Sequence, residues 1–171
     1  TTAGPMGGGY DYEFGWTEAI PASAFRYMAK LTNAVIPEGI TTIGSYAFHN
    51  SGITSISLPT TLKTISDNAF YNCDGLTSIV IPNGVTSIGN RAFYSCGALK
   101  QISMPGTVTS ISDSVFEGVA ATTAGPIGGG YDYEFGWTET IPSNAFREMQ
   151  KLTSAVIPEG ITTLGSYAFH S

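Results

Sequence analysis

The sequence repeats itself, and this restricts the fold more than any other feature. Residues 1–50 match residues 122–171 without a gap, at a constant offset of 121, and 41 of the 50 positions are identical. The 171 residues therefore comprise one unit, residues 1–121, and the first 50 residues of a second copy. Long internal repeats of this kind predict a solenoid, in which each repeat packs against its neighbours.

A shorter repeat runs inside the long one. Its marker is a phenylalanine after a small residue, at intervals of 22 or 23 residues with a single interval of 30: Phe25, Phe48, Phe70, Phe93, Phe116, Phe146 and Phe169. We expect one solenoid domain over residues 1–171, with regular coils at about 31–52, 53–75, 76–98, 99–121 and 152–171. The aromatic and glycine-rich segments 1–30 and 122–151 are atypical.

The coil at residues 76–98 shows how one repeat is built. Its expected interior positions are Leu76, Ile79, Ile81, Val85, Ile88 and Cys96. Alternation places Ile79 and Ile81 on one face of a short strand, and Pro82 ends that strand because it has no N–H to donate. We expect one helical or 3₁₀ turn at Ala92 and Phe93. One coil buries too little apolar surface to offset the cost of ordering it, so coils must stack.

The string L-x-x-I-x-I-P-x-x-V-x-x-I-G-x-x-A-F-x-x-C resembles the BspA-type leucine-rich repeats of bacterial and protozoan surface proteins. The resemblance covers residues 31–119 and 152–171, whereas residues 16–30 and 137–151 keep only its second half. It implies a right-handed leucine-rich-repeat coil of short parallel strands and irregular turns, with little long helix. It also implies an extracellular, cell-surface setting and binding to host matrix proteins or other cells. No catalytic residue comes with the family.

Charge excludes two classes of partner. The net charge is −6 and only 12% of residues are charged, so the chain has no basic stripe for nucleic acid and no polybasic patch for anionic lipid. No run of 18 apolar residues is present, so we expect no membrane insertion in this segment. Any signal or anchor is expected outside this chain.

The atypical segment carries an alternating aromatic pattern. Tyr10, Tyr12, Phe14 and Trp16 alternate with Asp11, Glu13 and Gly15, and the copy repeats the pattern with Tyr131, Tyr133 and Trp137. As a strand, this segment has one aromatic and one acidic face. The aromatic face is either a platform for a sugar or protein partner, or a filling for the coil interior.

Sites for metals, cofactors and catalysis are not expected. Asp11 and Glu13 are too few for a calcium loop, no zinc-type cysteine spacing occurs, and the GPMGGG run lacks the G-K-[ST] of a phosphate cradle. We interpret that run as a flexible loop. His49 and His170 share a repeat position that we expect to be variable and exposed, and they cannot form a Ser-His-Asp arrangement. We therefore predict no catalytic residue, no metal ligand and no cofactor, and we expect that the chain is not an enzyme.

Cys73 and Cys96 occupy one repeat position, which elsewhere holds Met28, Ser51 and Met149. This pattern favours two buried free thiols, although a disulfide between neighbouring coils stays open.

The exposed strand positions are small and nearly uncharged. Among them are Ser55, Ser57, Ser78 and Gln101. This face either binds a partner or serves as a solubilising surface coated with hydroxyls. The first hypothesis for function is a non-enzymatic binding and adhesion module of a larger bacterial surface protein, contacting a host protein or glycan. The alternative is a structural stalk, or a segment that self-associates end to end.

Overall fold

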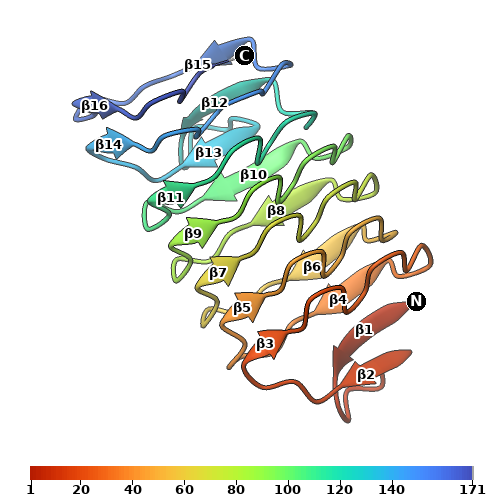
Figure 1. Cartoon of the computed structure of the whole chain (residues 1–171). Coiled ribbons are helices and arrows are strands. Elements are labelled where there is room, and N and C mark those ends of the chain that lie inside the picture. Colours follow the sequence, from red (N-terminus) through yellow and green to blue (C-terminus); the bar gives the residue numbers. More distant parts are fainter. Residues whose placement is uncertain (171) are drawn as a thin grey trace.

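A computed structural model describes residues 1–170 as a stack of coils (Figure 1), each turning once around a shared apolar core. Short parallel strands form two columns along the stack, and the described residues include no helix. The fold is thus a repeat solenoid, mostly β, as the sequence predicts.

The first column forms what we call the sheet face. Its strands are β1 (Thr2–Pro5), β2 (Tyr12–Phe14), β4 (Asn33–Val35), β6 (Ser55–Ser57), β8 (Ser78–Val80), β10 (Gln101–Met104), β12 (Thr123–Pro126), β13 (Tyr133–Phe135) and β15 (Ser154–Ala155). The second column contains β3 (Ala19–Ile20), β5 (Thr42–Ile43), β7 (Thr64–Ile65), β9 (Ser87–Ile88), β11 (Ser110–Ile111), β14 (Thr140–Ile141) and β16 (Thr163–Leu164).

Both columns keep the repeat in register. Ile79 lies opposite Ile102 in the sheet face, and Ile65 lies opposite Ile88 in the second column. These isoleucines are buried, whereas Ser78 and Val80 on either side of Ile79 point outward. The alternation of the sequence therefore becomes one apolar and one hydroxyl-rich side of each strand.

The repeated phenylalanines form a ladder through the core. Neighbouring rings of Phe25, Phe48, Phe70, Phe93 and Phe116 stack with centroids 4.9 to 5.6 Å apart. All five rings are buried. Offset stacking at this spacing adds attraction to the burial of apolar area, so each coil is bound to the next.

The turn after the second column is a single turn and not a longer helix. The Tyr94 N–H bonds to the Arg91 carbonyl at 3.2 Å across Ala92 and Phe93, while Arg91 and Ser95 on either side adopt left-handed backbone angles, with φ near 54°. This conformation interrupts a helix after a single turn. It directs the N–H groups of Arg91, Phe93 and Ser95 to carbonyls of the next coil, at 3.0, 3.0 and 2.8 Å. The turns thus contribute a third set of hydrogen bonds between coils.

The atypical segment adds a strand to its coil. Two strands, β12 and β13, join the sheet face, and β13 lies between β10 and β12 although it follows β12 in sequence. Tyr133 enters the phenylalanine ladder at this point, with its ring 5.3 Å from Phe116 and 5.0 Å from Phe146. The extra strand and ring account for the 30-residue interval.

The second column is interrupted beside the extra strand. Among residues 1–170, β14 pairs with β16 but not with β11. The Asn144 side-chain amide donates to the Ile111 carbonyl at 3.1 Å, in the place of the backbone N–H that bonds the equivalent Ile65 carbonyl in a regular coil. The Trp137 indole N–H donates to the Val108 carbonyl at 2.8 Å, whereas the equivalent Val85 carbonyl accepts from the Thr107 hydroxyl.

Candidate binding surface

A groove lies on the sheet face between β6 and β8. We call it the β6–β8 groove; its volume is 610 Å³. Ser55, Ser57 and Ser78, predicted from sequence as exposed binding positions, all line it. The remaining lining residues carry no charge: Ile56, Leu58, Thr60, Val80, Ile81, Pro82, Asn83, Gly84, Ser103, Pro105 and Ile127. The groove therefore suits a partner without charge at this point.

A smaller hollow continues along the same face. It has a volume of 140 Å³ and joins Ser78 and Gln101 to Tyr131 and Glu134. The structure thus brings together four of the predicted hydroxyl and amide positions and one predicted aromatic residue. By contrast, Tyr12 and Trp16 lie in the first coil, at the opposite side of β1 from β4.

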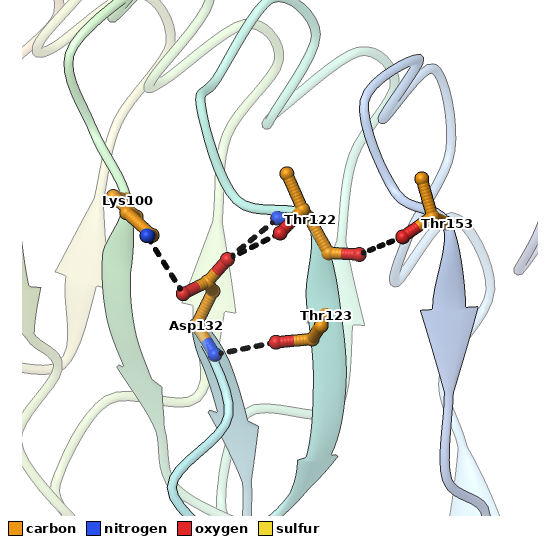
Figure 2. Close-up of polar contacts among 5 residues, drawn as sticks. All are labelled: Lys100, Thr122, Thr123, Asp132 and Thr153. Carbon is orange, nitrogen blue, oxygen red and sulfur yellow. Dashed lines mark hydrogen bonds and ion pairs between the residues drawn. The ribbon is translucent and has the colours of Figure 1, made fainter.

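Asp132 joins the extra strand, β13, to the chain on both sides of it (Figure 2). The Asp132 carboxylate accepts hydrogen bonds from the Thr122 N–H and hydroxyl at 2.9 and 2.8 Å, and the Asp132 N–H donates to the Thr123 hydroxyl at 3.0 Å. Lys100 from the β10 side lies 3.7 Å from the other carboxylate oxygen. Burial opposes ionisation here, but these donors and the lysine outweigh it, so the pKa of Asp132 lies below its ordinary value.

The glycine-rich run forms a loop that contacts the chain's own tyrosine and glutamate side chains. The ring of Tyr131 covers Gly125 and Gly129, where an added Cβ would lie within 2.3 Å of ring atoms. The Glu134 carboxylate accepts hydrogen bonds from the N–H groups of Gly128 and Gly130 at 3.1 and 2.7 Å. These bonds lower the pKa of Glu134. The loop thus forms an anion-binding nest filled by the chain's own carboxylate. The copy in residues 1–50 does the same with Glu13.

The aromatic residues divide between the two copies. Tyr133 and Trp137 are buried in the core, so in the second copy the aromatic face fills the coil interior. Tyr12 is 42% exposed and Trp16 is half-buried, because no coil packs on that side of them in the described structure. Tyr10, like Tyr131, lies half-buried over two glycines.

His49 is buried, although the sequence predicts an exposed position. Its ring is only 8% exposed and lies among Tyr27, Tyr46 and Tyr71. The Arg26 Nε–H donates to His49 Nδ1 at 3.1 Å. Burial and the positive charge of Arg26 lower the pKa of this imidazole. Sequence comparison within the chain missed this because other coils place polar residues at the same position.

The repeat pattern favoured two buried free thiols and left a disulfide open. In the structure, Cys73 and Cys96 are both free and buried. Each thiol donates to a core carbonyl at 3.0 Å, Cys73 to Phe48 and Cys96 to Phe70, and burial raises the pKa of Cys96. A buried thiol with a raised pKa, such as that of Cys96, is a poor nucleophile. Within residues 1–170, no group of three or more metal-ligating side chains occurs, and no helix is long and apolar enough to cross a membrane.

Stacked coils, parallel strands on one side and a phenylalanine ladder define a leucine-rich-repeat type of solenoid. The model of the BspA type leucine rich repeat region matches residues 18–124 and 137–171 in six copies, and the chain belongs to this family. The unmatched residues, 1–17 and 125–136, lie within the two aromatic, glycine-rich segments. No curated protein sequence gave a significant match.

Solved structures share the fold. A leucine-rich repeat protein of T. pallidum is 24% identical with a TM-score of 0.70, and the match covers 86% of this chain and 66% of that one. A leucine-rich repeat protein of Eubacterium ventriosum is 22% identical with a TM-score of 0.57, over 90% of this chain and 48% of that one. The pneumococcal vaccine antigen PcpA is 20% identical with a TM-score of 0.57, over 86% and 36%. The chain thus spans less than two thirds of each of these proteins.

Proposed function

We propose that this chain is a non-enzymatic binding module of a larger protein at a bacterial cell surface, and that the sheet face around β6, β8 and β10 contacts a protein partner. The observation that carries the proposal is the pair of adjoining hollows lined by Ser55, Ser57, Ser78 and Gln101. Membership of the BspA-type family supports the surface setting. Partner binding through a concave or flat repeat face is the common use of solenoids.

A charge placed in the groove tests this function. Ser78→Lys should weaken binding to the partner at least tenfold, because it places a charge at the edge of the β6–β8 groove, whose lining residues are all uncharged. Thr86→Lys is the matched control, since Thr86 is an exposed residue of the same coil outside both hollows. Purified extracellular-matrix proteins and glycans, presented separately, provide the panel. Equal binding by both variants would contradict the proposal, and binding to glycans alone would replace the protein partner with a sugar.

A further inference from the structure

The sheet face is split at one place inside the stack. Backbone ladders join β4 to β6 and β8 to β10, but within residues 1–170 no backbone hydrogen bond joins β6 to β8. The second column continues through the same two coils, since β7 pairs with β9. Figure 1 shows β6 and β8 as neighbours in the column. The split therefore affects only the sheet face.

Core side chains show the same split. Ile56 and Leu58 are partly exposed, whereas their counterparts Ile79 and Ile81 in the next coil are 3% exposed. The other partly buried hydrophobic residues packed against the core belong to the first and last coils: Trp16, Ala24, Met28, Leu152, Ala155 and Ile161. The β6–β8 groove is thus a place inside the stack where apolar core remains accessible.

A shorter turn explains why β6 stays close to β4. Ile53 follows Phe48 by five residues, whereas Leu76 follows Phe70 by six. The shortened turn draws Gly52 against the preceding coil, where an added Cβ would lie 2.0 Å from the Ala29 carbonyl oxygen. The coil that begins with β6 is therefore held toward β4 and away from β8.

The split leaves main-chain groups without partners on both sides. In a parallel sheet, alternate residues direct their N–H and C=O groups to opposite neighbours. The Ser55 N–H bonds to the Thr32 carbonyl of the β4 side, so the N–H and C=O of Ile56 face the groove. Likewise the Ile81 N–H bonds to Ser103 of β10, so the main-chain groups of Ser78 and Val80 face the groove.

We propose that the β6–β8 groove binds an extended peptide segment of a partner protein as an added strand, a specification that rests on the proposed function. Cα atoms of β6 and β8 come within 8 Å of each other, and an inserted strand needs about 10 Å between its two neighbours, so β6 and β8 move apart when the segment binds. The backbone of the segment then satisfies the free groups of Ile56 on one side and of Ser78 and Val80 on the other. Its inward side chains are apolar, because they meet Ile56 and Leu58. Its outward side chains are small and uncharged, because no charged residue lines the groove.

A peptide with these properties is the probe. Its sequence is LTSIVI, that of residues 76–81, blocked at both ends and labelled with fluorescein. Fluorescence anisotropy should show saturable binding to the wild-type chain. The same peptide methylated on two central amide nitrogens keeps its side chains but loses donors, so it should bind at least tenfold more weakly. Equal binding by the two peptides would overturn strand addition.

A reversible cross-link tests the location. Ser57 and Val80 occupy the same position of neighbouring coils and both are exposed, so a disulfide between Ser57→Cys and Val80→Cys would hold the groove at a Cα separation below about 7 Å, too narrow for an added strand. Peptide binding should fall at least tenfold on oxidation and return on reduction. Equal affinity in both states, or no binding by the reduced protein, would overturn the proposal.

A single substitution covers the case in which the double variant does not fold or oxidise. Val80→Pro removes an N–H that faces the groove while the N–H of Ile81 still bonds to β10, so it should weaken peptide binding without unfolding the chain. Unchanged peptide affinity in a folded Val80→Pro variant would contradict the location.

Dimerisation of the reduced double-cysteine variant that disappears on oxidation would instead assign the groove to a second copy of the chain. If Ser78→Lys weakens binding of the protein partner but the peptide never binds, the proposed function stands and binding by strand addition is contradicted.

Discussion

At the scale of single residues, the two copies of the long repeat provide natural controls. Within residues 1–170, the same aromatic side chains are buried in the second copy, which packs on the coil before it, and partly exposed in the first. Differences between matched variants therefore report on packing rather than on residue type.

Trp137 shows this contrast best. Trp137→Phe should lower the free energy of unfolding by about 1–3 kcal/mol, because it leaves the Val108 carbonyl without its donor. Trp16→Phe should change it by less than about 1 kcal/mol, since within residues 1–170 the indole of Trp16 has no hydrogen-bond partner and is half-buried. Urea unfolding measures both. Equal losses would show that the Trp137 hydrogen bond contributes little.

Removal of the Tyr133 hydroxyl should not lower the free energy of unfolding, in contrast to the substitution of Trp137. Its hydroxyl is buried without a hydrogen-bond partner, and burial raises the pKa of this phenol. Tyr133→Phe removes an unsatisfied polar group while keeping the ring in the core ladder, so stability should stay unchanged or rise by about 1 kcal/mol. A clear loss of stability on urea unfolding would mean that the hydroxyl has a partner in solution.

His49 should make stability depend on pH. Its pKa in the folded chain lies below the ordinary value of 6.5, so the unfolded chain binds the additional proton. Its contribution is complete above pH 6.5 and is lost as pH falls below that value. The melting temperature should therefore drop between about pH 7.5 and about pH 5.0, and His49→Asn should reduce that drop. His170→Asn is the control for an exposed histidine, and an unchanged drop in His49→Asn would contradict the assignment.

At the scale of elements, the glycine-rich loop and its tyrosine form one unit. Gly125→Ala should destabilise the chain by about 1 kcal/mol or more, because its Cβ would overlap the ring of Tyr131. In a double-mutant cycle, Tyr131→Ala should remove most of that loss. Additive losses in the cycle would show that the ring does not rest on Gly125.

The sequence predicted the regular coils because their pattern is local. Alternation within each strand and the phenylalanine spacing are properties of a single coil, and the structure confirms the repeat solenoid. The swapped order of β12 and β13 was beyond sequence reasoning, since it depends on Asp132, Glu134 and Tyr131 closing a loop across two strands. The burial of His49 was missed for a similar reason, because it depends on side chains from three coils.

For the site, the sequence identified exposed positions but not their arrangement. Ser55, Ser57 and Ser78 were predicted on the sheet face, and they do line one groove. The groove itself depends on a one-residue difference between the turns that follow Phe48 and Phe70. Such a difference is visible in the sequence, but its effect on sheet pairing requires the stacked coils.

At the scale of the whole molecule, the solenoid is two columns of strands with one interruption in each. The second column is interrupted between β11 and β14, where Trp137 and Asn144 supply donors. The sheet face is interrupted between β6 and β8, where no side chain takes that role among the described residues. Of these two interruptions, only the one in the sheet face, between β6 and β8, leaves both core side chains and main-chain groups accessible. For this reason we propose that the partner binds there.

Amide hydrogen exchange by NMR tests the split between β6 and β8 most directly, because protected and fast-exchanging amides should alternate along each of these strands. In the free protein, the amides of Ile56, Ser78 and Val80 should exchange quickly, whereas those of Ser55 and Ile81, bonded to β4 and β10, should be protected. Protection of Ile56, Ser78 and Val80 equal to that of Ser55 and Ile81 would show that β6 and β8 are paired in solution, and would contradict the groove.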